Sequence, residues 1–322
     1  MRTILALFLA LSLAFPTMGQ TRLELQFGNT TGKLSFSNSQ NKPDGEDPFP
    51  LGPLSFRIDG DTTWVADSLS GKLLHLDHHG NLLKVIETIA SGEESLVEDF
   101  SLEKDSKGAV SKIWVANGVT QVLTGFSSEG KKVQVFGGYG KGPGKFLQIN
   151  RIEIGSSGRL YVADKGRQKI SIFSADGKLV RELPWQWSGF CLDESENIYF
   201  LRWDEKNRRI NLVVESIDGA AVRNLPLDLE QHLNPDLWYV SANGETVISY
   251  MPAETPSFFK LARISREGYT IRVSDLKIPL GMNRFIAQND KDSLWLVEAD
   301  FELAPQGSFK IIRYDIGGTP EG

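Results

Sequence analysis

The sequence predicts an all-β protein, a six-bladed β-propeller with four antiparallel strands in each blade, and three features lead to this fold. First, a strand that reads aromatic-Val-Ala-Asp, or a variant of it, recurs six times in the 322 residues. The copies are anchored at Trp64, Trp114, Tyr161, Tyr199, Val247 and Trp295. Second, neighbouring anchors lie 38 to 50 residues apart, the length of a four-stranded blade. Third, a polar turn that ends in glycine recurs in phase with the anchors.

The first blade shows the expected order of strands and turns. Its strands are predicted at 54–58, 63–66, 73–76 and 82–86. The turn before the outermost strand has equivalents in the next three blades, and each copy has glycine at its last position. These turns are 77–80, 127–130, 174–177 and 216–219. Glycine there supplies the positive φ that a tight hairpin requires.

The sixth blade lacks a fourth strand of its own. Its predicted strands are 285–288, 294–297 and 309–314, and a closed ring does not leave such an edge unpaired. Segment 22–27 alternates apolar and polar residues as an outer strand does. We therefore expect 22–27 to pair with 309–314 and close the ring. Segment 38–50, rich in Pro, Asp, Asn and Gly, is expected to be a loop that leads to the first inner strand.

The N-terminus has the features of a signal peptide. Arg2 precedes an apolar run, 4–15, and Pro16-Thr17-Met18-Gly19 then offers small residues for a signal peptidase. We expect residues 1–19 to be removed and residues 20–322 to form a single exported propeller domain, either secreted or periplasmic. A short N-terminal anchor is the alternative. No later stretch has the roughly 20 apolar residues of a spanning helix, so no membrane span is expected.

The composition narrows the class of partner. The chain has 35 basic and 41 acidic residues and a net charge of −6, which argues against nucleic acid. The single cysteine, Cys191, lies in an apolar segment and is expected to behave as a small hydrophobic residue. We expect a monomer that binds a protein, a peptide, an anionic glycan or a small-molecule ligand.

The third blade carries the most distinctive motifs. It contains Phe-Gly-Gly-Tyr-Gly-Lys-Gly-Pro-Gly-Lys-Phe at 136–146, Arg-Leu-Tyr-Val-Ala-Asp at 159–164 and Ile-Ser-Ile-Phe at 170–173. This blade resembles the NHL repeat, with one departure at Ile149, where the repeat usually has proline. The resemblance implies a propeller and says little about function, because NHL-like propellers include binding scaffolds, RNA binders and a metal-dependent lyase.

Residues at equivalent places in the inner strands should surround the mouth of the central channel. Aligning the strands gives Ser55, Asp99, Arg151, Gly189, Leu237 and Arg284. Arg151 and Arg284 each follow an asparagine, Asn150 and Asn283, and belong to opposed blades. Two guanidinium groups facing each other would suit a carboxylate, sulfate or phosphate. The alternative is that each arginine is paired with a neighbour, for instance Arg151 with Asp99.

The long connections lie on one face of the propeller, where binding residues usually occur. Trp187 and Trp203 are in two of them and could stack on sugars or apolar side chains. Alternation places either Trp185 or Trp187 between blades. Arg202 adds a cation, and the basic residues of these loops gather in blades three and four, where they could steer an anionic ligand; ordinary solvated charge is the alternative. They are Lys141, Lys145, Lys165, Arg167, Arg202, Arg208 and Arg209.

Catalytic motifs are weak. The four histidines are spread over a strand, a hairpin and a loop and do not form the set that the zinc lyase on a similar propeller needs. No nucleophile elbow or phosphate loop is present. We therefore expect a non-catalytic binding or scaffold protein without a cofactor. The alternative is a metal-dependent hydrolase or lyase in which channel residues hold calcium, with Asp99, Glu153 and Asn150 as the nearest candidates.

Overall fold

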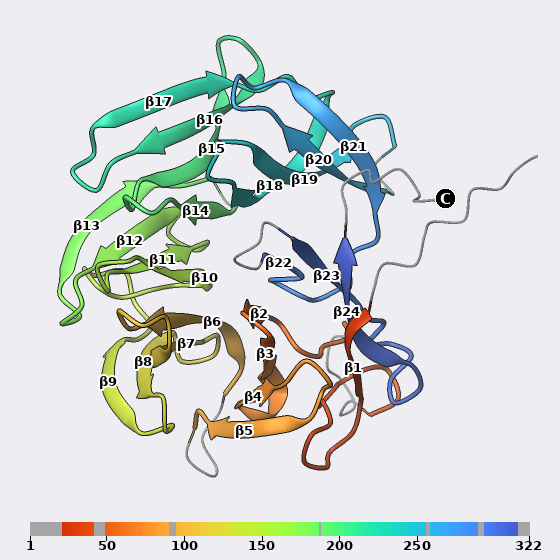
Figure 1. Ribbon diagram of the computed structural model, residues 1–322. Coiled ribbons are helices and arrows are strands. Elements are labelled where there is room, and N and C mark those ends of the chain that lie inside the picture. The colour runs from red at the N-terminus through yellow and green to blue at the C-terminus, as the bar shows by residue number, and fades with distance from the viewer. Residues whose placement is uncertain are drawn as a thin grey trace, which may run out of the picture.

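The computed structural model of the chain describes residues 21–41, 49–89, 95–186, 188–255, 258–288 and 293–314. Six four-stranded antiparallel sheets form a ring, which confirms the predicted six-bladed β-propeller (Figure 1). We call the centre of this ring, where the innermost strands face one another, the channel. The expected signal peptide, 1–19, and residues 42–48 of the expected loop lie outside the described residues. Among the described residues, no helix is long and apolar enough to cross a bilayer.

Each blade contributes one strand to each of four concentric positions. The innermost strands are β2 (Phe56–Asp59), β6 (Val97–Lys104), β10 (Ile149–Ile154), β14 (Phe190–Leu192), β18 (His232–Val240) and β22 (Ile286–Gln288). The second strands are β3 (Thr62–Asp67), β7 (Val110–Asn117), β11 (Leu160–Asp164), β15 (Ile198–Asp204), β19 (Thr246–Pro252) and β23 (Leu294–Glu298). The third strands are β4 (Lys72–Leu76), β8 (Val122–Ser127), β12 (Lys169–Phe173), β16 (Arg209–Glu215), β20 (Phe259–Ile264) and β24 (Ser308–Tyr314). The outermost strands are β5 (Leu82–Glu87), β9 (Lys132–Gly137), β13 (Leu179–Pro184), β17 (Ala221–Pro226), β21 (Thr270–Leu276) and β1 (Thr21–Gln26).

The repeated aromatic-Val-Ala-Asp motif occupies the second strands, and its burial explains its composition. These strands are packed between neighbouring blades on both faces, so β11 is buried at every position. The terminal aspartate is buried too, and its oxygens accept hydrogen bonds from the segment that enters the blade. Asp164 accepts from the backbone N–H groups of Leu147 (3.0 Å) and Gln148 (2.9 Å), and Asp67 accepts from that of Ser35 (2.8 Å). The motif therefore fixes a blade to its incoming connection.

The apolar core is divided among the spaces between blades. One cluster joins blades three and four, where Tyr161 and Trp185 pack with Phe200. The largest cluster joins blades five, six and one, where the ring closes. Trp185, one of the two candidates for an interblade position, is buried in the first of these clusters, and Trp187 lies outside the described residues.

The N-terminal strand closes the ring as predicted. β1 pairs antiparallel with β24, with Leu23 opposite Ile311 and Leu25 opposite Phe309 (Figure 1). Its buried residues alternate with exposed ones, as the sequence pattern indicated. Because β24 follows β22 and β23 along the chain, the sixth blade is assembled from both ends of the described chain.

A cluster in the channel and a groove on the loop-bearing face

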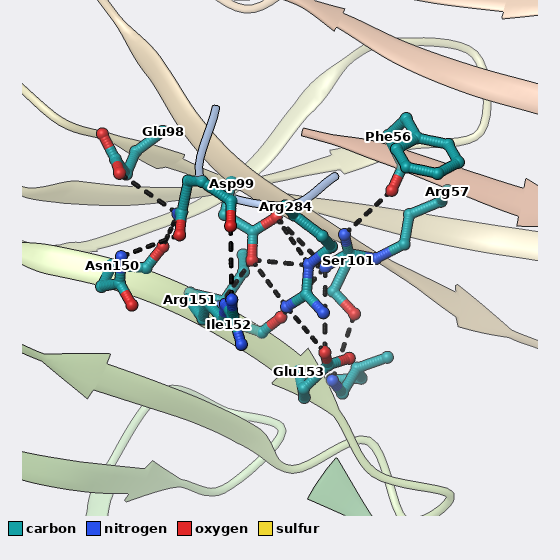
Figure 2. Close-up of polar contacts among 12 residues, drawn as sticks. Phe56, Arg57, Glu98, Asp99, Ser101, Asn150, Arg151, Ile152, Glu153 and Arg284 are labelled. Carbon is teal, nitrogen blue, oxygen red and sulfur yellow. Dashed lines mark hydrogen bonds and ion pairs between the residues drawn. The ribbon is translucent and has the colours of Figure 1, made fainter. Parts of the chain in front are cut away.

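Four charged side chains from four blades meet in the channel. Arg57 (β2), Asp99 (β6), Glu153 (β10) and Arg284, just before β22, form a network of ion pairs (Figure 2). Arg284 Nη2 lies 3.0 Å from Asp99 Oδ2 and 2.7 Å from Glu153 Oε1. Arg57 Nη2 lies 3.2 Å from Asp99 Oδ1, and the backbone N–H of Ile152 donates to Asp99 Oδ2 at 3.0 Å. Two arginines and two carboxylates thus balance one another, and we call them the channel cluster.

The pKa directions reflect this mutual pairing. Burial alone would raise the pKa of Asp99, but the charges of Arg284 and Arg57 lower it to about 2. Burial tends to lower the pKa of Arg284, while Asp99 and Glu153 more than offset this and raise it. The pKa of Arg57 is lowered by burial and by the charge of Arg284. All three groups remain charged at neutral pH.

Arg151 has a different set of partners. Its Nη1 and Nη2 donate to Asp236 Oδ1 (2.9 Å) and Oδ2 (2.6 Å), and the guanidinium lies 4.1 Å from the ring centroid of Trp238. Gly189 makes room for this pair, because a Cβ there would lie 2.2 Å from the carbonyl oxygen of Leu237 and 2.7 Å from Arg151 Nη1. The inner strands of blades four and five can therefore approach closely only with glycine at this position.

The expected anion site between Arg151 and Arg284 is therefore wrong in its main assumption, that the two guanidinium groups are unpaired. Arg284 is paired with Asp99 and Glu153, and Arg151 with Asp236. The alternative, that each arginine is paired with a neighbouring carboxylate, is correct, although Arg151 pairs with Asp236 and not with Asp99. An anionic ligand would have to displace carboxylates that already occupy both arginines.

The two asparagines that precede these arginines are hydrogen-bonded to each other, a contact that the sequence analysis did not predict. Asn150 Nδ2 donates to Asn283 Oδ1 at 2.8 Å, and Asn283 Nδ2 donates to the Asn150 carbonyl and to Glu98 Oε1. Glu98 was not among the expected site residues. Burial, followed by the charge of Asp99, raises the pKa of Glu98 to about 8, although Lys165 lowers it.

Glu98 should make the stability of the protein depend on pH. Its pKa is raised from 4.5, so between pH 4.5 and about 8 the folded chain keeps a proton that the unfolded chain releases. Folding stability should therefore fall as the pH rises through this window. Glu98→Gln cannot ionise, and we expect it to exceed the parent in stability by about 4 kcal/mol at pH 8 and by only about 1 kcal/mol at pH 5.

Thermal unfolding of both proteins from pH 5 to pH 9 checks this expectation. Glu254→Gln is the control, because the carboxyl group of Glu254 is exposed and lies in another loop. This variant should show the same dependence of melting temperature on pH as the parent. If the melting temperatures of the parent and Glu98→Gln changed in parallel with pH, Glu98 would titrate as an ordinary carboxyl group and the prediction would be wrong.

A groove lies between blades four and five, at the ends of strands that carry the long connections. Its first half has a cavity volume of about 390 Å³ and is lined by Gln168, Gln186, Ser188, Leu201, Trp203, Ile210, His232 and Pro235. The second half, about 500 Å³, is lined by Trp203, Arg208, Arg209, Ile210, Leu227, Leu229, Glu230, Gln231, His232 and Ala253. Because the two halves share Trp203, Ile210 and His232, we treat them as one groove, the blade 4–5 groove.

Trp203 and His232 are the most distinctive side chains of the blade 4–5 groove. The indole of Trp203 is 42% exposed, while its backbone N–H donates to Gln186 Oε1 at 2.8 Å. His232 Nδ1 lies 2.7 Å from the Glu230 carbonyl oxygen. Since a carbonyl oxygen only accepts, Nδ1 carries the hydrogen, and Nε2 of the neutral ring is an acceptor. Within the described ranges, Nε2 has no hydrogen-bond partner.

The other expected loop residues have mixed outcomes. Arg202 is exposed, and its Nη2 lies 3.3 Å from Glu215 Oε1, so it is a paired surface cation and does not line the groove. Trp187 lies outside the described residues, between the groove residues Gln186 and Ser188 in sequence. Ligand contacts by Asp99, Asn150 and Asn283 stay predictions.

The groove also contains residues that sequence reasoning did not select as site residues. His232 is the first residue of β18, where the sequence indicated a loop, and Arg208 lies in the connection between β15 and β16. They belong to different blades, and no motif links them. The concentration of basic residues in the loops of blades three and four was the signal that could have pointed to Arg208.

Comparison with known proteins supports the fold. A family model described as a 6-bladed beta-propeller matches residues 65–231, and the chain belongs to this family. The NHL assignment of the third blade stays a prediction. No curated protein sequence is recognisably similar to the chain.

Several solved structures share the architecture at low sequence identity. A protein of unknown function from Bacteroides caccae is 14% identical, with a TM-score of 0.51 over 70% of this chain and 82% of its own. A catalytically inactive virginiamycin B lyase from Staphylococcus aureus, solved with quinupristin, is 12% identical, with a TM-score of 0.52 over 84% of this chain and 86% of its own. BBS1N, solved in complex with ARL6DN, is 11% identical, with a TM-score of 0.51 over 81% of this chain and 77% of its own. At these identities the likeness concerns the fold alone.

Proposed function

We propose that this protein is an exported binding propeller that holds its ligand, without changing it chemically, in the blade 4–5 groove. The observation that carries the proposal is that an exposed indole and an imidazole acceptor without a partner in the described structure lie in one groove on the loop-bearing face. The charges of the channel are engaged with one another, which leaves the groove as the better ligand site.

The export proposal rests on the composition of residues 1–19, with Arg2 followed by the apolar run 4–15. Intact-mass measurement on the protein from its native host tests it. A mature chain that begins near Gln20 would support export, and retention of Met1 in a membrane fraction would contradict it.

A metal-dependent activity in the channel has less support from the donor set. Asp99 and Glu153, two of the expected calcium ligands, pair with Arg57 and Arg284. A calcium ion would have to displace both cations from these carboxylates, so the cluster is a poor fit for calcium. Burial also raises the pKa of the Cys191 thiol, which disfavours a reactive thiolate beside the cluster.

A thermal-shift screen tests the binding proposal, with oligosaccharides, short peptides and organic acids as probes. We expect at least one class to raise the melting temperature of the parent and to have no effect on Trp203→Ala, because the indole supplies the main apolar contact. Tyr139→Ala is a matched control, since Tyr139 is 73% exposed, lies on a long connection elsewhere in the ring and does not line the groove.

Two results would contradict the proposal. One is a screen without any stabilising class, and the other is stabilisation that persists in Trp203→Ala. Mass spectrometry of a stabilising probe after incubation with the protein separates binding from catalysis, since we expect the probe to be recovered intact.

A further inference from the structure

We propose that the ligand of the blade 4–5 groove is an acidic saccharide, with a sugar ring packed on Trp203 and a carboxylate or sulfate bound by Arg208. This inference rests on the proposed function, because it names the chemistry of the ligand at the same groove. Three features of the groove support it: the apolar side chains of its walls, the hydrogen-bonding groups of His232 and Gln168, and the cationic side chain of Arg208 at one end.

The walls suit a ring that has an apolar face. Trp203 lines the first half of the groove together with the apolar residues Leu201, Ile210 and Pro235, and Ile210 lies opposite it on β16. A partly exposed indole with apolar neighbours offers a flat contact for the C–H face of a sugar.

The polar groups of the groove match hydroxyl groups. His232 Nε2 accepts hydrogen bonds, and the amide of Gln168 both donates and accepts. In the described structure the Gln168 side chain has no partner. A saccharide hydroxyl can donate to the imidazole and accept from the amide, and the few polar groups among apolar walls would orient it.

The second half of the groove is suited to an anion. In the part of the chain that the structure describes, the side chain of Arg208 has no ion pair or hydrogen bond. Its neighbour Arg209 makes one long ion pair, with 4.0 Å between Arg209 Nε and Asp204 Oδ2. That aspartate is held by its own turn, since Asn207 Nδ2 donates to Asp204 Oδ2 at 2.7 Å. A guanidinium presents a planar set of donors that fits carboxylate or sulfate oxygens.

The acidic residue of the groove does not oppose this assignment. Glu230 Oε1 accepts from Tyr250 (2.7 Å) and Lys260 Nζ (2.9 Å), so its charge is balanced by a neighbouring lysine. It is therefore not available as the partner of Arg208.

The backbone gives no reason for arginine at position 208. Arg208 has a φ of 49°, and the corresponding turns of the first three blades also have a left-handed residue, Gly71 (65°), Gln121 (59°) and Gln168 (54°). Glycine adopts this conformation without strain, and arginine does so at a cost. The left-handed conformation at position 208 therefore does not favour arginine over glycine.

Extended peptides are a less suitable class of ligand. They commonly bind by adding a strand to an open sheet edge. β15 and β16, which provide Trp203 and Ile210, are the two central strands of their sheet and are paired on both sides. The groove thus presents side chains and no free strand edge.

A printed array of oligosaccharides that carry uronic acid, sulfate or no charge tests the proposal on the full-length protein. We expect the parent to bind acidic members and not the neutral ones, and to bind less at 0.5 M than at 0.05 M NaCl. The arms with uronic acid and with sulfate identify the acidic group.

The variants then assign the contacts, with affinities measured by titration of an acidic saccharide bound on the array. Arg208→Gly should weaken binding at least about tenfold, because a charge-assisted hydrogen bond is lost. The same variant should fold at least as stably as the parent, since glycine suits the left-handed turn. Trp203→Ala should abolish binding. Arg272→Ala, an exposed arginine on β21, and Tyr139→Ala should bind as the parent does.

The outcomes separate this inference from the proposed function. Binding of neutral saccharides that Arg208→Gly leaves unchanged would overturn the acidic-saccharide proposal, as would an array without any Trp203-dependent binding. If peptides or organic acids stabilise the parent through Trp203 while no saccharide binds, the proposed function stands and this inference fails.

Discussion

Deletion of Thr21–Phe27 is expected to cause aggregation or a large fall in the melting temperature. The deletion removes the partner of β24 and exposes the edge of the sixth blade, which becomes free to pair with another chain. It also removes Leu23, Leu25 and Phe27, all buried in the cluster that joins blades five, six and one. Burial of each such side chain contributes about 1.5–3 kcal/mol, so the three together account for about 4.5–9 kcal/mol, a large part of the roughly 5–15 kcal/mol that stabilises a typical domain.

Point variants separate the contribution of the buried side chains of β1 from that of its backbone pairing with β24. The double variant Leu23→Ala/Leu25→Ala should lose about 2–5 kcal/mol of stability for each substitution, whereas Glu24→Ala/Gln26→Ala, on the exposed face of the same strand, should melt near the parent. Thermal and urea unfolding measure both. A truncated chain that melts like the parent would show that ring closure does not depend on β1.

Asp99→Asn should be the most destabilising single substitution in the channel. Asp99 is fully buried and pairs with Arg57 and Arg284. Its replacement leaves two buried guanidinium groups with the single carboxylate of Glu153, and removal of one partner from a buried ion pair typically costs about 3–5 kcal/mol. Because the pKa of Asp99 is lowered to about 2, its contribution is present above pH 3.8 and is lost as the pH falls through about 2.

A surface pair provides the control for Asp99→Asn. Asp176 pairs with Lys178 in an exposed turn, and Asp176→Asn should leave the urea midpoint near that of the parent. If Asp99→Asn were equally mild, the channel cluster would not be a stabilising network, and its arginines would be able to exchange Asp99 for another anion.

The architecture could be predicted from the sequence because the strand and turn pattern of each blade is visible within its own repeat. Trp64, Trp114 and Tyr161 lie at equivalent places on β3, β7 and β11, and the spacing between them reflects the four strands of a blade. The alternation of Leu23 and Leu25 with polar residues likewise indicated an outer strand with one buried face. These signals are short-range and survive sequence divergence within the repeats.

The partners of the channel arginines could not be predicted in the same way. Alignment of the inner strands gave the positions of Arg151 and Arg284, but not which carboxylates lie within reach of their side chains. Asp236 belongs to blade five, and Glu153 lies two residues after Arg151 yet pairs with Arg284. Which side chains contact one another in the channel depends on the twist and stagger of the inner strands, and the repeat pattern does not predict these.

The groove was predictable only in part. Trp203 was expected in a connection on the loop-bearing face because it follows the second strand predicted for blade four, and the structure places it on β15, one residue before that strand ends. His232 and Arg208 carried no such signal, since a histidine or an arginine in a loop is ordinary. Only the packing of blade four against blade five places these side chains together.

A crystal structure of the protein with a stabilising compound from the thermal-shift screen would show where the ligand binds. We expect electron density for the compound against the indole of Trp203, within hydrogen-bond distance of His232 Nε2. Density in the channel among Asp99, Glu153 and Arg284, or on the outer strands with the blade 4–5 groove unoccupied, would contradict the proposed function.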